Sequence, residues 1–248
     1  SGVPDSLLKS FCAFVMDSTT PDRHIIAANE GAAVSIGIGH YLATNNVPLI
    51  YMQNSGLGNS LNPLISLADK EVYSIPMILM IGWRGEPGKP DEPQHIKQGE
   101  IMIDLLEAMK IPYEVISCAT NNQSAKNIVN RLYNKAKSEN EPVALVVSKN
   151  TFSKYELRNK KNYPYSMSRE TALDLLISHL TPEDIVVSTT GVLSRELFEL
   201  REQKDQSHDK DFLTEGGMGH SNQIALGIAL ENNRNVYCLD GDGSIIMH

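Results

Sequence analysis

Cysteine, basic residues and long apolar runs are all scarce in this sequence. Its 248 residues include three cysteines, Cys12, Cys118 and Cys238, and no C-x-x-C pair. An odd number of widely separated cysteines suits a reducing compartment better than a disulfide framework. The apolar fraction of 41% is sufficient for hydrophobic cores without such cross-links.

No apolar run approaches the ~20 residues that a membrane-spanning helix needs. The longest run, at 74–82, contains a proline and predicts a buried strand. Asp5 and Lys9 interrupt the N-terminal residues, which argues against a signal peptide. We therefore expect a cytoplasmic protein without a membrane anchor.

Basic residues number 22 against 30 acidic residues, which gives a net charge of −8. Nucleic-acid binding over a broad surface relies on a basic face, so this balance disfavours it. A site for a small anion has to be built locally, from a few Arg or Lys side chains or from helix N-termini.

Short apolar runs alternate with helical patterns, which predicts an α/β protein with parallel sheets. Strands are expected at 48–52, 76–82, 113–116, 142–147, 185–187 and 235–239. The polar segment 83–99 predicts a long loop, and Ser168 and Ser194 are expected to cap helices.

A change of composition near residue 150 predicts two domains, 1–150 and 168–248, joined by a linker at 151–167. The second domain has only two convincing strands, and a parallel sheet needs further strands and crossovers to bury its faces. We therefore expect the second domain to be incomplete and the chain to be a fragment, lacking material mostly at its C-terminus.

Three polar glycine loops accompany the strands of the second domain, at 189–191, 216–220 and 241–243. Ligands of open parallel sheets bind at the carboxyl edge, where backbone N–H groups can hold a diphosphate and a carboxylate can hold Mg²⁺. Each loop alone is more typical of an ordinary turn. The three together indicate an anion site.

The first domain offers fewer and more ambiguous candidates. Glu30 begins a helix, a position where acidic residues are common because of the helix dipole, but it could also hydrogen-bond a ring nitrogen of a ligand. Arg84 and His95 stand in the polar segment, where Arg suits a phosphonate or carboxylate and a solvated surface loop is equally compatible. The remaining candidates are polar turn residues, Asp5, Ser6, Asn54 and Ser55.

Together these segments resemble the thiamine diphosphate-dependent decarboxylases of 2-oxo acids, and their phosphonopyruvate branch in particular. The motifs that carry the resemblance are GVPDS at 2–6, NEGAA at 29–33, QNSG at 53–56, GWRGEPG at 82–88, DEPQH at 91–95, TTG at 189–191, GMGH at 217–220 and GDG at 241–243. They are spread along nearly the whole chain.

The resemblance implies a pyrimidine-binding domain at 1–150 and a diphosphate-binding domain at 168–248. Thiamine diphosphate and Mg²⁺ would then lie at a subunit interface of a homo-oligomer. It also implies that Glu30 is catalytic at the pyrimidine N1′ and that Asp242 ligates Mg²⁺. Other cofactor contacts are implied for Asn54, Ser55, Thr190, Gly191, Gly217, Met218, Gly219, His220, Gly241, Gly243 and Ser244, and substrate contacts for Asp5, Ser6, Arg84 and His95.

The implied activity is decarboxylation of 3-phosphonopyruvate to phosphonoacetaldehyde and CO2 through a thiamine diphosphate ylid, in phosphonate biosynthesis. In this cofactor class an asparagine beyond the GDG motif also ligates Mg²⁺. The sequence ends at His248 before that position, so we expect the chain alone to be inactive.

Three alternatives remain open at this point. A sulfopyruvate decarboxylase would use the same cofactor, and a second cation near Arg84 would favour phosphonate over the less charged sulfonate. A non-catalytic nucleotide-binding module is disfavoured because no G-x-G-x-x-G follows the first strand. A structural or regulatory role fits the clustering of glycine loops less well.

Overall fold

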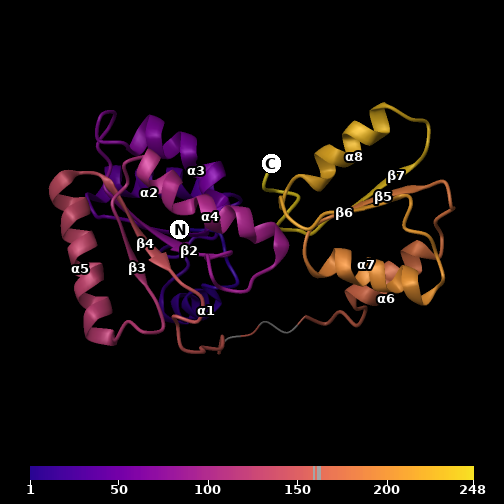
Figure 1. Cartoon of the computed structure of the whole chain (residues 1–248), viewed down its shortest axis with the longest axis horizontal. Coiled ribbons are helices and arrows are strands. Elements are labelled where there is room, and N and C mark those ends of the chain that lie inside the picture. Colours follow the sequence, from indigo (N-terminus) through magenta and orange to yellow (C-terminus); the bar gives the residue numbers. More distant parts are fainter. Residues whose placement is uncertain (159, 161–162) are drawn as a thin grey trace. The chain divides into compact units, whose positions relative to one another are not determined.

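The computed structural model describes the whole chain except residues 159, 161 and 162. Contacts divide it into two compact units, residues 1–160 and 161–248. Each unit is built on its own parallel sheet (Figure 1), which confirms the predicted α/β class. The predicted linker at 151–167 includes three positions outside the described residues, and the domain assignments 1–150 and 168–248 stay predictions.

The first unit has a four-stranded sheet in the order β1-β2-β4-β3. Its strands are β1 (Leu49–Gln53), β2 (Met77–Gly82), β3 (Tyr113–Ile116) and β4 (Pro142–Val147). Its helical segments are α1 (Lys9–Ser18), α2 (Glu30–Thr44), η1 (Asn54–Gly56), α3 (Leu57–Pro63), η2 (Leu64–Ala68), α4 (Pro93–Ala108) and α5 (Asn122–Glu139). The N-terminal residues run beside β1, where Gly2 bridges to Tyr51.

Helices cover both faces of this sheet. Successive side chains of a strand point to opposite faces, so alternate residues of β2 enter two different cores. Met77, Leu79 and Ile81 of β2 belong to the core formed with α2, α3, η2 and α4. Ile78 and Met80 belong to the core formed with α1 and α5. Figure 1 shows these two groups of helices around the sheet. Because β2 and β4 are buried along their whole length, they form the rigid centre of the unit.

The second unit has a three-stranded sheet in the order β6-β5-β7. Its elements are α6 (Arg169–Ile177), β5 (Ile185–Ser188), α7 (Val192–Gln203), β6 (Asp211–Leu213), α8 (Ser221–Leu230) and β7 (Val236–Leu239). Residues of α6, β5 and α7 form its core, and α8 contacts β5 and β7. In the parts of the chain that the model describes, no helix combines the length and apolar character needed to cross a bilayer.

Three expectations about individual elements were wrong. The polar segment 83–99 is not all loop, because α4 begins at Pro93, where proline's missing N–H is tolerated in the first helical turn. The second unit has a third strand, β6, which is too short to show an alternating pattern. Gly191 rather than Ser194 precedes α7, and Ser194 instead donates to the Thr189 carbonyl at 2.7 Å. The predicted cap at Ser168 is confirmed.

Candidate active site

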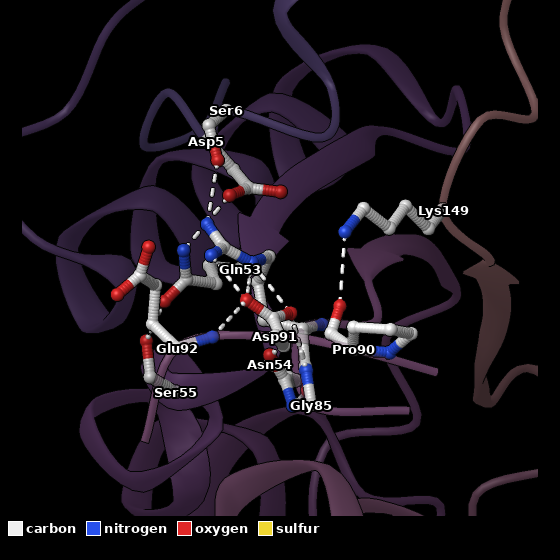
Figure 2. Close-up of polar contacts among 11 residues, drawn as sticks. Asp5, Ser6, Gln53, Asn54, Ser55, Gly85, Pro90, Asp91, Glu92 and Lys149 are labelled. Atoms are coloured by element: carbon white, nitrogen blue, oxygen red, sulfur yellow. Dashed lines mark hydrogen bonds and ion pairs between the residues drawn. The ribbon is translucent and has the colours of Figure 1, made fainter. Parts of the chain in front are cut away.

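The carboxyl ends of β1, β2 and β4 bring together the polar residues of the first unit. β1 pairs with β2 and β2 pairs with β4, and the pairings run to the last residues of all three strands. Ligands of parallel α/β sheets bind at this edge. Figure 2 shows the polar contacts that connect the segments there.

Glu30 is buried at the start of α2, with 5% of its surface exposed. The side chain of Asn29 caps the helix by accepting from the Ala32 N–H at 2.8 Å. Asn59 Nδ2 donates to Glu30 Oε2 at 2.8 Å. A Cβ at Gly56 would lie 2.3 Å from Glu30 Cγ, so only glycine leaves room for the carboxylate. The Glu30 carboxylate is therefore held by its position at the start of α2, by the Asn59 amide and by the close fit against Gly56.

Arg84 follows β2 and is paired with Asp91. Arg84 Nε donates to Asp91 Oδ2 at 2.9 Å, and Arg84 Nη2 donates to Asp91 Oδ1. Asp91 also accepts from the N–H groups of Gly85 at 2.7 Å and Glu92 at 2.8 Å. The hydrogen bond from Arg84 holds the pKa of Asp91 far below its usual range, and these two N–H groups lower it further, although burial opposes them. The same pairing raises the pKa of Arg84, so both groups stay charged.

Asn54 fixes the backbone of Arg84 from the neighbouring strand end. Its Nδ2 donates to the Arg84 carbonyl at 2.8 Å, and its Oδ1 accepts from the Arg84 N–H at 3.1 Å. The guanidinium is held from the other side, where Nη1 donates to Ser6 Oγ at 2.8 Å. Both the main chain and the side chain of Arg84 are thus held in one position.

Asp5 is buried next to this network. Its Oδ1 accepts from Gln53 Nε2 at 2.8 Å, and Gln53 Oε1 accepts from Ser55 Oγ at 2.7 Å. Asp5 Oδ2 is also buried and has no hydrogen-bond donor among the residues that the model describes. Buried polar atoms without a partner are rare in folded proteins. A Cβ on Gly82 would approach this oxygen to 2.1 Å.

His95 lies in the first turn of α4. Burial lowers its pKa and the positive charge of Arg84 adds to that effect, against the opposing influence of Asp91, Asp5 and Glu92. At neutral pH the ring is therefore uncharged and can accept a hydrogen bond. The substrate contacts predicted for Asp5, Ser6, Arg84 and His95 stay predictions, but all four belong to one neighbourhood.

In the second unit the three glycine loops meet at the carboxyl ends of β5, β6 and β7. Ser244 Oγ accepts from the Gly219 N–H at 2.9 Å and lies 3.0 Å from Thr189 Oγ1. Thr190 Oγ1 donates to the Glu215 carbonyl. Ser221, the first residue of α8, donates to Asp240 Oδ2 at 3.0 Å. Ser244 therefore contacts both of the other loops, and the Thr190 and Ser221 hydroxyls add further links between the strand ends.

Gly191 and Gly241 leave the main chain of these loops open to a ligand. Gly191 and Gly219 have φ values of 95° and 92°, a region that L side chains rarely adopt. A Cβ on Gly191 or Gly241 would meet no atom within 4 Å. The N–H groups of Gly219, Gly241 and Gly243 already donate to Ser244, Asp240 and Asp242. At Gly241 the missing side chain, rather than the N–H, therefore leaves room for a ligand, whereas a Cβ on Gly219 would lie 2.7 Å from Met247 Cβ.

Asp242 is exposed at the tip of its loop, and its Oδ1 accepts from the Gly243 N–H at 2.9 Å. Met218 is 44% exposed, with its methyl carbon 3.5 Å from where a Cβ on Gly243 would be. His220 Nδ1 lies 3.0 Å from the Gly217 carbonyl. Outside residues 159, 161 and 162, no group of three or more His, Cys, Asp or Glu side chains could hold a metal. Mg²⁺ is commonly bound by one or two carboxylates together with ligand phosphates, so a single Asp242 fits it.

Two contributors were missed in the sequence. Asn59 holds Glu30 but lies inside a helix, where no pattern distinguishes it. Asp91 belongs to the DEPQH motif, but its ion pair with Arg84 depends on how the loop folds back. Neither contact can be predicted from a pattern in the sequence.

Comparison with known proteins finds similarity over both units. Residues 1–111 match the family described as thiamine pyrophosphate enzyme, N-terminal TPP binding domain. The whole chain is 31% identical to the phosphonopyruvate decarboxylase of Streptomyces viridochromogenes and covers 63% of it. It is 26% identical, over 99% of its length, to the sulfopyruvate decarboxylase of Methanosarcina acetivorans and covers 65% of it.

A third relative consists of separate subunits. Sulfopyruvate decarboxylase subunit alpha of Methanococcus maripaludis is 35% identical over 46% of this chain and 65% of its own length. Subunit beta of the same organism is 37% identical over 33% of this chain and 41% of its own length. The chain thus spans less than two thirds of the full-length relatives it matches. The family match over residues 1–111 and the similarity along the whole chain both concern thiamine pyrophosphate enzymes and 2-oxo acid decarboxylases.

Proposed function

We propose that the protein containing this chain decarboxylates 3-phosphonopyruvate to phosphonoacetaldehyde and CO2 with thiamine diphosphate and Mg²⁺. The observation that carries the proposal is the buried Glu30, held by Asn59 above Gly56 in the segment that matches the thiamine pyrophosphate family. The similarity to phosphonopyruvate decarboxylases along the whole chain supports the choice of substrate.

The residues of both units fit this cofactor. Glu30 can hydrogen-bond a ring nitrogen and hold a proton there, because one of its oxygens is anchored by Asn59. The loops joined by Ser244 offer a diphosphate a surface of open glycine backbone, and Asp242 offers a carboxylate to Mg²⁺. When bound, thiamine diphosphate supplies the electron sink that accepts the electrons left by CO2.

Asp5, Ser6, Arg84 and His95 would bind and orient the substrate. The guanidinium of Arg84 is fixed before the ligand arrives, which reduces the entropy lost on binding. His95, uncharged at neutral pH, can donate its one ring N–H to the substrate without adding charge.

We also propose that the cofactor lies between subunits of a homo-oligomer. Beside Asn59, which holds Glu30, α3 and η2 expose the apolar side chains of Leu61, Ile65 and Leu67, and a partner subunit could cover them. Light scattering of the protein with and without Mg²⁺ and thiamine diphosphate tests this, and a monomer with full activity would contradict it.

The direct test of the function is Glu30→Gln. The amide keeps the size of the side chain but cannot support the same proton at the ring nitrogen, so kcat should fall about 10²- to 10⁴-fold. Phosphonoacetaldehyde formation is followed by phosphorus NMR, and the affinity for the Mg²⁺ and thiamine diphosphate pair by calorimetry. The affinity should change only a few-fold.

Glu71→Gln is the matched control, because Glu71 is exposed outside the site. An unchanged kcat in Glu30→Gln would remove Glu30 from this role. Calorimetric binding of NAD in place of thiamine diphosphate would favour a nucleotide-binding module instead.

A sulfopyruvate decarboxylase is the second candidate, supported by the similarity to the Methanosarcina acetivorans enzyme. The two activities share the cofactor and differ in the charge of the substrate's tail. Comparing kcat/KM for phosphonopyruvate and sulfopyruvate decides between them.

A further inference from the structure

The candidate substrate residues at the carboxyl edge of the first unit, Asp5, Ser6, Arg84 and His95, offer an anionic ligand little unpaired positive charge. Arg84 is already paired with Asp91, and Asp5 adds a second carboxylate in the same neighbourhood. The nearby Lys89 is paired with Glu86 at 2.8 Å. A dianionic ligand arriving at Arg84 alone would therefore meet a site whose positive charge is already balanced.

Lys149 occupies the corresponding place on the neighbouring strand. Gly82, the last residue of β2, is in register with Val147, the last residue of β4, and the Trp83 N–H donates to the Val147 carbonyl at 2.9 Å. Arg84 and Lys149 each follow two residues after that pair. Adjacent strands lie about 4.8 Å apart, so the main chain leaves the sheet towards Arg84 and Lys149 at neighbouring positions.

The ammonium of Lys149 is held close to the Arg84 and Asp91 pair without being neutralised. Its Nζ donates to the Pro90 carbonyl at 2.9 Å, one residue before Asp91, as Figure 2 shows. Among the residues for which the model gives a placement, Lys149 makes no ion pair. An ammonium has three N–H donors, so this contact leaves others for a ligand.

We propose that Lys149 is a specificity-determining residue, the second cation of an anion subsite that it forms with Arg84 and that favours a phosphonate over a sulfonate. The inference rests on the proposed decarboxylase function and deepens it. A phosphonate resembles a phosphate ester in carrying close to two negative charges at neutral pH, whereas a sulfonate carries one. Arg84, fixed by Asp91, supplies the directed hydrogen bonds, and Lys149 supplies the unbalanced charge.

The test is Lys149→Gln with both substrates. Loss of a charge-assisted hydrogen bond should lower kcat/KM for phosphonopyruvate about 10- to 100-fold. For sulfopyruvate the decrease should be only about threefold, because the second charge is missing. Lys149→Arg should restore most of the preference for phosphonate. Equal decreases for the two substrates, or no decrease, would overturn the proposal.

A binding measurement separates this inference from the proposed function. Calorimetry with phosphonoacetate and with sulfoacetate, neither of which is a 2-oxo acid, compares the same two tails without turnover. The wild type should prefer phosphonoacetate and Lys149→Gln should lose that preference. Lys154→Gln is the control, because Lys154 is 84% exposed and paired with Glu156.

If the wild type turns over neither 2-oxo acid, the proposed function fails and the binding comparison still decides the role of Lys149. An equal affinity of the wild type for the two probes would refute the inference even in an active enzyme.

Discussion

The two units prepare their candidate sites in different ways. In the first unit the polar side chains hold one another: Asn54 holds Arg84, Asp91 pairs with it, and Gln53 bonds to Asp5. In the second unit three glycine loops offer open backbone at Gly191 and Gly241 and are joined by small hydroxyl side chains, with Ser244 in contact with two other segments. Substitutions in the first unit should therefore disturb a rigid network, and those in the second should mainly loosen loops.

The largest expected effect is on the stability of the first unit, in Gly99→Ala. A Cβ on Gly99 would lie 1.7 Å from the Gly85 carbonyl oxygen, a backbone atom that cannot move without displacing the loop that carries Arg84. We expect the free energy of unfolding to fall by about 3 kcal/mol, measured by denaturant unfolding.

Gly58→Ala is the matched control for that variant. A Cβ on Gly58 meets nothing within 4 Å and Gly58 lies inside α3, so alanine should stabilise the unit by about 0.5–1 kcal/mol. If Gly99→Ala and Gly58→Ala were equally stable, the network around Arg84 could deform without cost, and the contrast drawn between the two units would be wrong.

A smaller effect is expected for Asp91→Asn. Removing the charge leaves the half-buried Arg84 without its counterion and should lower the free energy of unfolding by about 2 kcal/mol at pH 7. The pKa of Asp91 is depressed in the folded state, so its contribution is complete above the unfolded pKa of about 3.9. It is lost as the pH falls below that value towards the folded pKa.

Denaturant unfolding of wild type and Asp91→Asn across this pH range measures the difference. The difference in the free energy of unfolding between the two proteins should become smaller only in acid. A difference that does not depend on pH would contradict the role of the ion pair.

The smallest effect on stability is expected in the second unit, for Ser244→Ala. The variant loses the hydrogen bonds to Gly219 and Thr189, so the free energy of unfolding should fall by about 1 kcal/mol. Calorimetric affinity for Mg²⁺ and thiamine diphosphate should also fall, because Gly219 and Thr189 lose their link through Ser244. Ser207→Ala, in an exposed turn, serves as control; if both variants bind alike, Ser244 does not organise the loops.

Local patterns in the sequence were sufficient to predict much of the fold. The apolar runs that became β2 and β4 are buried throughout, and the parallel arrangement followed from their alternation with helices. Parallel strands end at one edge, so the meeting of the glycine loops in the second unit could also be expected. β6 was missed because three residues carry too little pattern.

Contacts between distant residues could not be predicted in the same way. Asn59 reaches Glu30 across 29 positions, and Asn54 reaches Arg84 across 30. Lys149 stands at the change of composition that predicted a linker, and its importance emerges only from the register of β4 against β2. Such pairings depend on tertiary geometry, which composition and periodicity do not encode.

The amide of Asn54 has one more consequence. After Gln53 the main chain turns into η1, so it can no longer pair with the segment that follows β2, and the side chain takes over as a substitute peptide group. An aspartate has the same shape but no N–H to offer the Arg84 carbonyl, and a leucine offers neither partner. A substitution at position 54 would therefore break the link between η1, whose Gly56 lies against Glu30, and the main chain of Arg84. The positions of Glu30 and Arg84 would then no longer be coupled, although neither residue had itself been changed.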